Sequence, residues 1–330
     1  MSTCSSDQNL KRARPSWAGL GLFAAGFLAL YAAAAVIAEF RVARAGAEAP
    51  FQRLLAARGA AADWVVLGAS HALPLDWGEV PRRLEEDTGQ RMLILAETGA
   101  GPLYMRMVAD QALRDVAPAR ALYVLDDFAF FDRRWNAGRI EDRALLRLTP
   151  LRASTVALLA GAVRAEGVDP RALLDYLTGF SKLNPPERFP AQGWEGEAAF
   201  DRVHRPSRHA VRARMEFLYP DGAELAQARP ALEDFARLLD RLGSAGTRVV
   251  VLRLPVPEAF RAAAPRPPAF EAALSRTLDA AGVPLVDLSA ALDVPEFYFD
   301  TDHLNRAGVE ALYDRHLRDL LSEPPETEGG

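Results

Sequence analysis

Short apolar runs alternate with amphipathic stretches through most of this chain. Five mostly apolar runs are typical of strands, and they lie at 64–67, 91–95, 121–125, 249–254 and 284–288. The first two are typical of buried strands, and the first is expected to be covered on both faces. Between them, apolar positions recur at helical spacing over 80–87, 102–116, 231–242 and 269–281. This alternation predicts a three-layer α/β/α fold with about five parallel strands joined by right-handed crossovers.

The alternation stops between residues 132 and 230. Helical patterns over 145–165 and 170–177 are followed by a loop rich in Pro, Gly and Trp at 184–196. We interpret 132–230 as an insertion or lid within a domain that covers 63–330. The pattern also predicts a final helix capped by Asn305, with one apolar face formed by Val309, Leu312, Tyr313, Leu317 and Leu320.

An uncharged apolar segment, residues 16–38, precedes the domain. As a helix it would extend roughly 34 Å, enough to cross a bilayer core of about 30 Å. We expect a retained membrane anchor, with a cytoplasmic leader at 1–15 and a juxtamembrane stalk or first helix at 39–62. The alternative is a signal sequence cleaved near Ala38. The predicted location is the inner membrane, single-pass, with the C-terminal domain in the periplasm.

Composition narrows the function classes. The net charge is −5 and the cations are nearly all Arg, without the dense basic stripe of a nucleic-acid-binding protein. Cys4 is the only cysteine, so neither a disulfide framework nor a cysteine metal site is expected. No His or acidic pair shows ligand spacing on a predicted helix, and we expect neither metal nor cofactor.

Two short motifs almost 230 residues apart carry candidate chemistry. Gly68-Ala69-Ser70-His71 follows the first strand, and Asp300-Thr301-Asp302-His303 precedes the last helix. They supply a hydroxyl, a carboxylate and an imidazole, the three groups that activate a serine for acyl transfer. Asp300 and His303 are three residues apart, so the carboxylate can orient the imidazole, whereas Asp302 is expected to point away. Taken singly, the motifs also fit a helix N-cap at Ser70 and a solvated acidic turn.

These motifs resemble those of the SGNH (GDSL-like) hydrolase superfamily. The chain is similar to a membrane-anchored branch of exopolysaccharide O-acetyltransferase-like proteins, such as those of alginate O-acetylation and D-alanyl teichoic acid transfer. The resemblance covers 63–131 and 231–321, with Gly99-Ala100-Gly101 as the glycine block. It implies an SGNH/flavodoxin-like sheet, a Ser70 nucleophile, a His303 base oriented by Asp300, and an oxyanion hole.

The resemblance builds that oxyanion hole from the Ser70 amide, a glycine amide (Gly99 or Gly101) and an Asn side chain. Where the family often has Gly-x-Asn, this chain has Asp126-Asp127. A carboxylate 4 Å from a developing oxyanion would oppose it by about 4 kcal/mol at an effective dielectric near 20. Either Asp127 points elsewhere or another donor replaces the Asn, and His71 and Asn136 are the candidates.

Other residues are candidate substrate contacts. His204 and His209 lie among arginines that could bind an anionic glycan, although a solvated helix face explains them equally well. Aromatic side chains that could stack on sugar rings, or simply belong to the core, are Phe128, Phe130, Phe131, Trp135 and Trp194.

The sequence thus predicts a membrane-anchored serine esterase or O-acyltransferase that modifies a cell-envelope carbohydrate through an acyl-serine. Its expected partners are a glycan or acyl donor and a membrane-bound acyl-exporting protein. Two alternatives stay open: a non-catalytic carbohydrate-binding or assembly subunit with a decayed site, and a soluble lipase-like enzyme whose leader is cleaved.

Overall fold

The computed structural model describes residues 17–44, 49–190 and 194–322, so the predicted leader at 1–15 lies outside the described part. Five parallel strands form one sheet in the order β2-β1-β3-β4-β5. Their bounds are β1 Trp64–Gly68, β2 Met92–Ile94, β3 Arg120–Val124, β4 Arg248–Arg253 and β5 Leu285–Asp287. Every residue of β1 and β3 is buried, as expected of strands covered on both faces.

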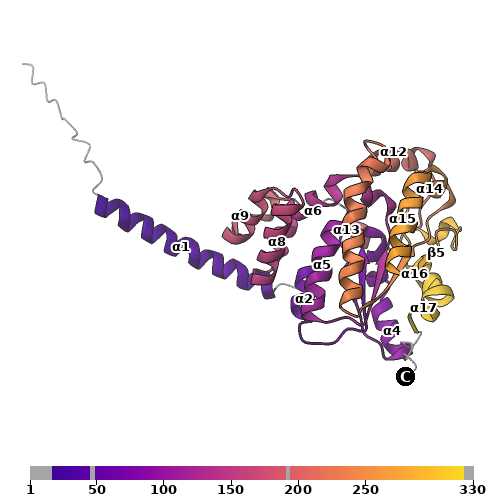
Figure 1. The fold of residues 1–330 in the computed structure, drawn as a ribbon, viewed down its shortest axis with the longest axis horizontal. Coiled ribbons are helices and arrows are strands. Elements are labelled where there is room, and N and C mark those ends of the chain that lie inside the picture. The colour runs from indigo at the N-terminus through magenta and orange to yellow at the C-terminus, as the bar shows by residue number, and fades with distance from the viewer. Residues whose placement is uncertain (1–16, 45–48, 191–193, 323–330) are drawn as a thin grey trace, which may run out of the picture.

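Helices cover both faces of the sheet (Figure 1). One face carries α2 (Pro50–Ala56), α5 (Pro102–Asp115), α13 (Leu225–Ser244) and α15 (Pro268–Ala281). The other carries α3 (Leu73–Trp77), α4 (Val80–Thr88), α16 (Arg306–Leu312) and α17 (Arg318–Ser322). The predicted three-layer α/β/α fold is confirmed.

Helix ends follow local capping chemistry. Asn305 caps α16 as predicted, because its side chain accepts a hydrogen bond from the Gly308 amide at 3.0 Å. The helix predicted to begin at 231 begins earlier, at Leu225, where the Glu224 amide donates to the Gln227 side chain at 2.8 Å in a capping box. Pro230 therefore lies inside α13, although a proline usually marks a helix boundary.

The insertion is helical and falls into two parts. Its helices are α6 (Ala137–Glu141), α7 (Arg143–Leu148), α8 (Ala153–Ala165), α9 (Pro170–Thr178), α10 (Phe180–Leu183), α11 (Gly196–Ala199) and α12 (Arg208–Leu218). The helix expected over 145–165 is divided into α7 and α8 around Pro150, since proline removes a backbone donor. Helix α10 packs against α1, whereas α12 packs against α14 (Glu258–Ala263) at the opposite end of the domain (Figure 1).

The N-terminal apolar segment forms the 28-residue helix α1 (Trp17–Arg44), which projects away from the domain (Figure 1). By length and composition it could cross a membrane or serve as a signal sequence. The region predicted as a stalk or first helix divides in two: residues 39–44 continue α1, and α2 packs on α5 with Phe51 and Leu54 buried. The second part thus belongs to the core of the domain.

Candidate active site

The candidate nucleophile lies on a tight turn at the carboxyl end of β1, the edge where open α/β sheets place their ligands. Gly68 has φ +145°, and a Cβ there would lie 2.7 Å from the Val124 carbonyl oxygen. Only glycine fits this close approach between neighbouring strands. The chain then enters the short 3-10 turn Ser70–Ala72, with Ser70 buried. The Ser70 hydroxyl does not cap a helix, because it faces a histidine from the other end of the chain.

The structure brings Ser70, His303 and Asp300 together. His303 Nε2 lies 2.9 Å from Ser70 Oγ, and His303 Nδ1 lies 2.9 Å from Asp300 Oδ2. Asp300 Oδ1 also accepts from the His303 amide at 2.8 Å, so the carboxylate fixes both the ring and its backbone. With Asp300 holding Nδ1–H, the neutral tautomer leaves Nε2 free to accept the serine proton.

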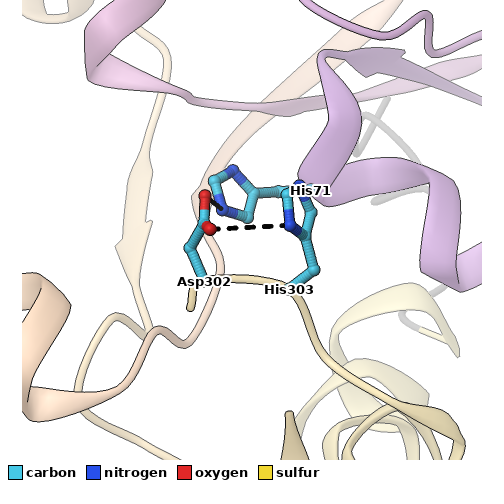
Figure 2. Close-up of side chains that lie close together, drawn as sticks. All are labelled: His71, Asp302 and His303. Carbon is cyan, nitrogen blue, oxygen red and sulfur yellow. Dashed lines mark ion pairs between the residues drawn. The ribbon is translucent and has the colours of Figure 1, made fainter. Parts of the chain in front are cut away.

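A second group of charged side chains lies directly behind the triad. The His71 ring stacks on the His303 ring at a centroid distance of 4.5 Å, with Asp302 beside both (Figure 2). His71 Nδ1 pairs with Asp126, and His71 Nε2 lies 3.3 Å from Asp302 Oδ2. Arg214 from α12 reaches the same carboxylate at 2.8 Å. The prediction that Asp302 points away is wrong, because it is fully buried between these cations.

These pairings set the charges of the buried groups. Burial alone would lower the pKa of His71, but the charges and hydrogen bonds of Asp126 and Asp302 outweigh it and raise that pKa to about 10. Burial would raise the pKa of Asp302, yet Arg214, His303 and His71 hold it well below its ordinary value. Burial would also raise the pKa of Asp300, but the charge of His303 outweighs it. The pKa of Asp300 is therefore lowered.

The charges around His303 complement the imidazolium that this ring becomes during catalysis. Three carboxylates (Asp126, Asp300, Asp302) lie with two cations, His71 and Arg214, around the His303 ring. The cluster therefore carries one excess negative charge while His303 is neutral. When His303 takes the serine proton the cluster becomes neutral overall, which stabilises the charge that develops in the transition state.

Two backbone amides are the candidate donors for the predicted oxyanion hole. Those of Ser70 and Gly99 have no hydrogen-bond acceptor in the described part of the chain, and both residues line the cavity next to the nucleophile. The Gly101 amide instead donates to the Trp135 carbonyl at 2.6 Å. The Asn136 side chain donates to the Ala129 carbonyl at 2.8 Å and is buried. Gly101 and Asn136 are therefore structural partners and not free donors.

Asp127 turns away from the oxyanion position. Its Oδ1 lies 3.0 Å from Arg253 Nη2, and Asp127 does not line the cavity at Ser70. Burial, partly offset by Arg253, raises the pKa of Asp127 to about 6. The repulsion expected from this sequence departure is thus avoided by orientation, and Asp127 is not positioned as a substrate contact.

An open cavity of about 800 Å³ leads to Ser70. One wall comes from α12 of the insertion, and much of the lining is aromatic, with Phe128, Trp135, Trp194 and Phe217. Three of the predicted stacking aromatics thus line the cavity, whereas Phe130 and Phe131 belong to the core. His204 and His209 do not line it, and neither does His71, which is packed behind His303.

His71, Asp302 and His303 also form a group whose nitrogen and oxygen atoms lie within 4.8 Å of one another, as metal ligands would. Each of these residues already has a partner of its own: Asp126 for His71, Arg214 for Asp302 and Asp300 for His303. A guanidinium on the central carboxylate opposes a metal cation, and the donors suit a charge network better than a metal site.

Sequence reasoning missed Asp126, Asp302 and Arg214 as members of the site. Arg214 lies within an Arg-rich helix where nothing in the sequence distinguishes it from its neighbours. Asp126, by contrast, directly follows β3, and the carboxyl ends of parallel strands meet at one edge of the sheet. The position of Asp126 directly after β3 could therefore have indicated that it belongs to the site.

No family model and no curated protein matches this chain. Among solved structures, it is similar to a candidate acylhydrolase from Bacteroides fragilis (8% identity, TM-score 0.36, covering 79% of this chain and 88% of the other). It is also similar to a GDSL-like lipase from Bacteroides thetaiotaomicron (6% identity, TM-score 0.34, covering 78% of this chain and 89% of the other). A third similar structure is a candidate platelet activating factor from Streptococcus pneumonia (11% identity, TM-score 0.37, covering 93% of this chain and 99% of the other). We therefore infer the chemistry of the site from the residues of this chain.

Proposed function

We propose that this protein is a membrane-anchored serine esterase or O-acyltransferase that acts on a cell-envelope carbohydrate. The observation that carries the proposal is the His303 Nε2 to Ser70 Oγ distance of 2.9 Å, with Asp300 on the opposite ring nitrogen. The separation is within hydrogen-bonding reach of a general base and its nucleophile.

The reaction would proceed through an acyl-serine intermediate. His303 takes the Ser70 proton as Oγ attacks the acyl carbonyl, and the Ser70 and Gly99 amides stabilise the oxyanion. His303 then returns the proton to the leaving alcohol. In the second half-reaction it deprotonates a sugar hydroxyl or a water molecule, which attacks the acyl-serine and regenerates the free hydroxyl.

The cavity supports a carbohydrate as the acceptor. It is open, about 800 Å³ in volume, and lined by aromatic rings that can stack on a pyranose. The helix α1 supports an envelope location, in which the anchor lies in the inner membrane and the domain in the periplasm. There a membrane-bound acyl-exporting protein would supply the acyl group.

The test is turnover of p-nitrophenyl acetate by the full chain in detergent, with and without acetylated or free envelope oligosaccharides. We expect p-nitrophenol release that Ser70→Ala abolishes, and faster release when an oligosaccharide acceptor is present. His209→Gln is the matched control, because His209 is exposed and does not line the cavity. Equal rates for wild type and Ser70→Ala, together with oligosaccharide binding, would favour the non-catalytic binding protein instead.

A further inference from the structure

The insertion is docked on the C-terminal half of α1. Tyr31 Oη donates to the Thr178 carbonyl at 2.9 Å, and Glu39 pairs with Lys182. Glu39 also accepts from the Leu151 amide at 2.9 Å. The partly buried positions of α1 recur at helical spacing, at 31, 35, 38, 39 and 42. One face of α1 is thus held by the insertion, whose helix α10 packs against it.

This contact extends into the apolar part of α1. Glu39 is the first charged residue of the helix, and Tyr31 lies about 12 Å further toward the N-terminus at 1.5 Å per residue. If α1 spans a bilayer, the Thr178 end of α9 reaches the level of the outer leaflet, since half of the hydrocarbon core is about 15 Å. The neighbouring side chains suit that level, because Leu151, Leu174 and Leu177 are 46%, 59% and 49% exposed.

A cleft of about 410 Å³ lies between α1 and the insertion, and we call it the anchor cleft. Its lining combines four apolar side chains of α1 with three cations: Ala34, Ile37, Ala38, Val42, Arg41, Arg147 and Lys182. Lys182 is neutralised by Glu39. Arg41 and Arg147 make no ion pair with any residue that the structure describes.

Arg147 carries a further indication of an anionic ligand. Its Nε is buried and has no hydrogen-bond partner among the residues described. A buried donor without an acceptor is unfavourable, and the penalty is larger for a charged group. The guanidinium of Arg147 lines the cleft, and guanidinium groups match phosphate geometry.

We infer that the anchor cleft binds the phosphodiester headgroup of an anionic phospholipid of the surrounding bilayer, with Arg41 and Arg147 on the phosphate and the acyl chains along Ala34, Ile37 and Ala38. The cleft volume lies within the roughly 300–1,000 Å³ typical of small-molecule sites. The inference rests on the membrane anchorage in the proposed function. A lipid held there would lock the insertion to α1 and fix how the catalytic cavity faces the membrane.

The experiment is native mass spectrometry of the full chain released from detergent, titrated with phosphatidylglycerol, with phosphatidylcholine and with inorganic phosphate. We expect saturable binding of phosphatidylglycerol in preference to the zwitterionic lipid, and no retention of inorganic phosphate, which lacks acyl chains. Arg147→Gln should weaken phosphatidylglycerol binding about 5-fold, and Arg41→Gln with Arg147→Gln about 30-fold. Arg164→Gln, an exposed arginine of α8 outside the cleft, is the matched control and should bind as wild type does.

Thermal unfolding and p-nitrophenyl acetate turnover of each variant show that the fold is intact. Equal affinity for the two lipids, or phosphatidylglycerol binding unchanged in the double variant, would overturn the inference while leaving the anchorage standing. The mass of the mature chain purified from membranes shows whether the anchor is retained. A chain that lacks residues 1–38 would have lost Ala34, Ile37 and Ala38, and both the anchorage and the anchor cleft would be rejected.

Discussion

The buried imidazolium of His71 provides the most detailed test of the site. His71 lies between two carboxylates and is almost inaccessible to solvent, so its folded-state pKa of about 10 stands well above the 6.5 of an unfolded histidine. A group whose pKa is raised on folding contributes stability that is fully present below the unfolded pKa. That contribution is lost as the pH rises through the folded value. The stabilisation is therefore complete below about pH 6.5 and gone above about pH 10.

The size of the effect follows from the two pKa values. Linkage gives about 4 kcal/mol of stabilisation at pH 7, between about 1 and 2 kcal/mol at pH 9 and less than about 1 kcal/mol at pH 10. His71→Gln removes the group whose pKa is raised on folding. The difference in unfolding free energy between wild type and His71→Gln should thus shrink by about 4 kcal/mol between pH 7 and pH 10.5.

The assay is urea unfolding of the full chain in detergent, followed by tryptophan fluorescence from pH 6 to 10.5, for wild type, His71→Gln and the exposed control His209→Gln. Because the chain has only five histidines, ¹³C labelling at histidine Cε1 offers a direct second measurement. The resonance missing from His71→Gln should keep the shift of a protonated ring up to about pH 9. A stability difference that stays constant with pH, or a His71 resonance that titrates below pH 7, would refute the reasoning.

Three further substitutions test neighbouring parts of the account. Asp300→Asn should lower kcat for p-nitrophenyl acetate by about 10⁴, as the wrong tautomer of His303 is favoured, and a loss below about 10-fold would count against the triad. Asp302→Asn leaves His71 and Arg214 without their shared carboxylate and should destabilise the fold by about 3–5 kcal/mol in urea unfolding. Asp201→Asn breaks an exposed pair with Arg306 and should destabilise the fold far less than Asp302→Asn does. Similar losses for both would contradict the role of Asp302. Gly68→Ala should lower the melting temperature more than Gly89→Ala does. Both glycines have positive φ, but of the two only Gly68 has atoms, those of Val124, within 4 Å of the added Cβ. Equal shifts in melting temperature would argue against the close approach at Gly68.

The sequence was sufficient to predict the sheet and to bring Ser70, Asp300 and His303 to one edge of it. Buried parallel strands have a strong apolar signal, and the topology then places the ends of β1 and the residues before α16 near each other. Local chemistry also predicted the cap at Asn305.

The charge network behind the triad was not predictable in the same way. Asp302 was expected to point away because it neighbours His303, but its direction is decided by Arg214, which comes from α12 of the insertion 88 residues earlier. The choice between the candidate oxyanion donors could not be made from the sequence either. Gly99 and Gly101 are equivalent in the motif, and only the packing of Trp135 and Asn136 against Gly101 distinguishes them.

The central claim, that Ser70 is an activated nucleophile, is tested most directly by a fluorophosphonate probe on the full chain. Peptide mapping by mass spectrometry then locates the adduct. We expect one adduct, on Ser70, which is absent in Ser70→Ala and forms much more slowly in His303→Ala. Labelling elsewhere, labelling at the same rate in His303→Ala, or no labelling of a folded protein would contradict it.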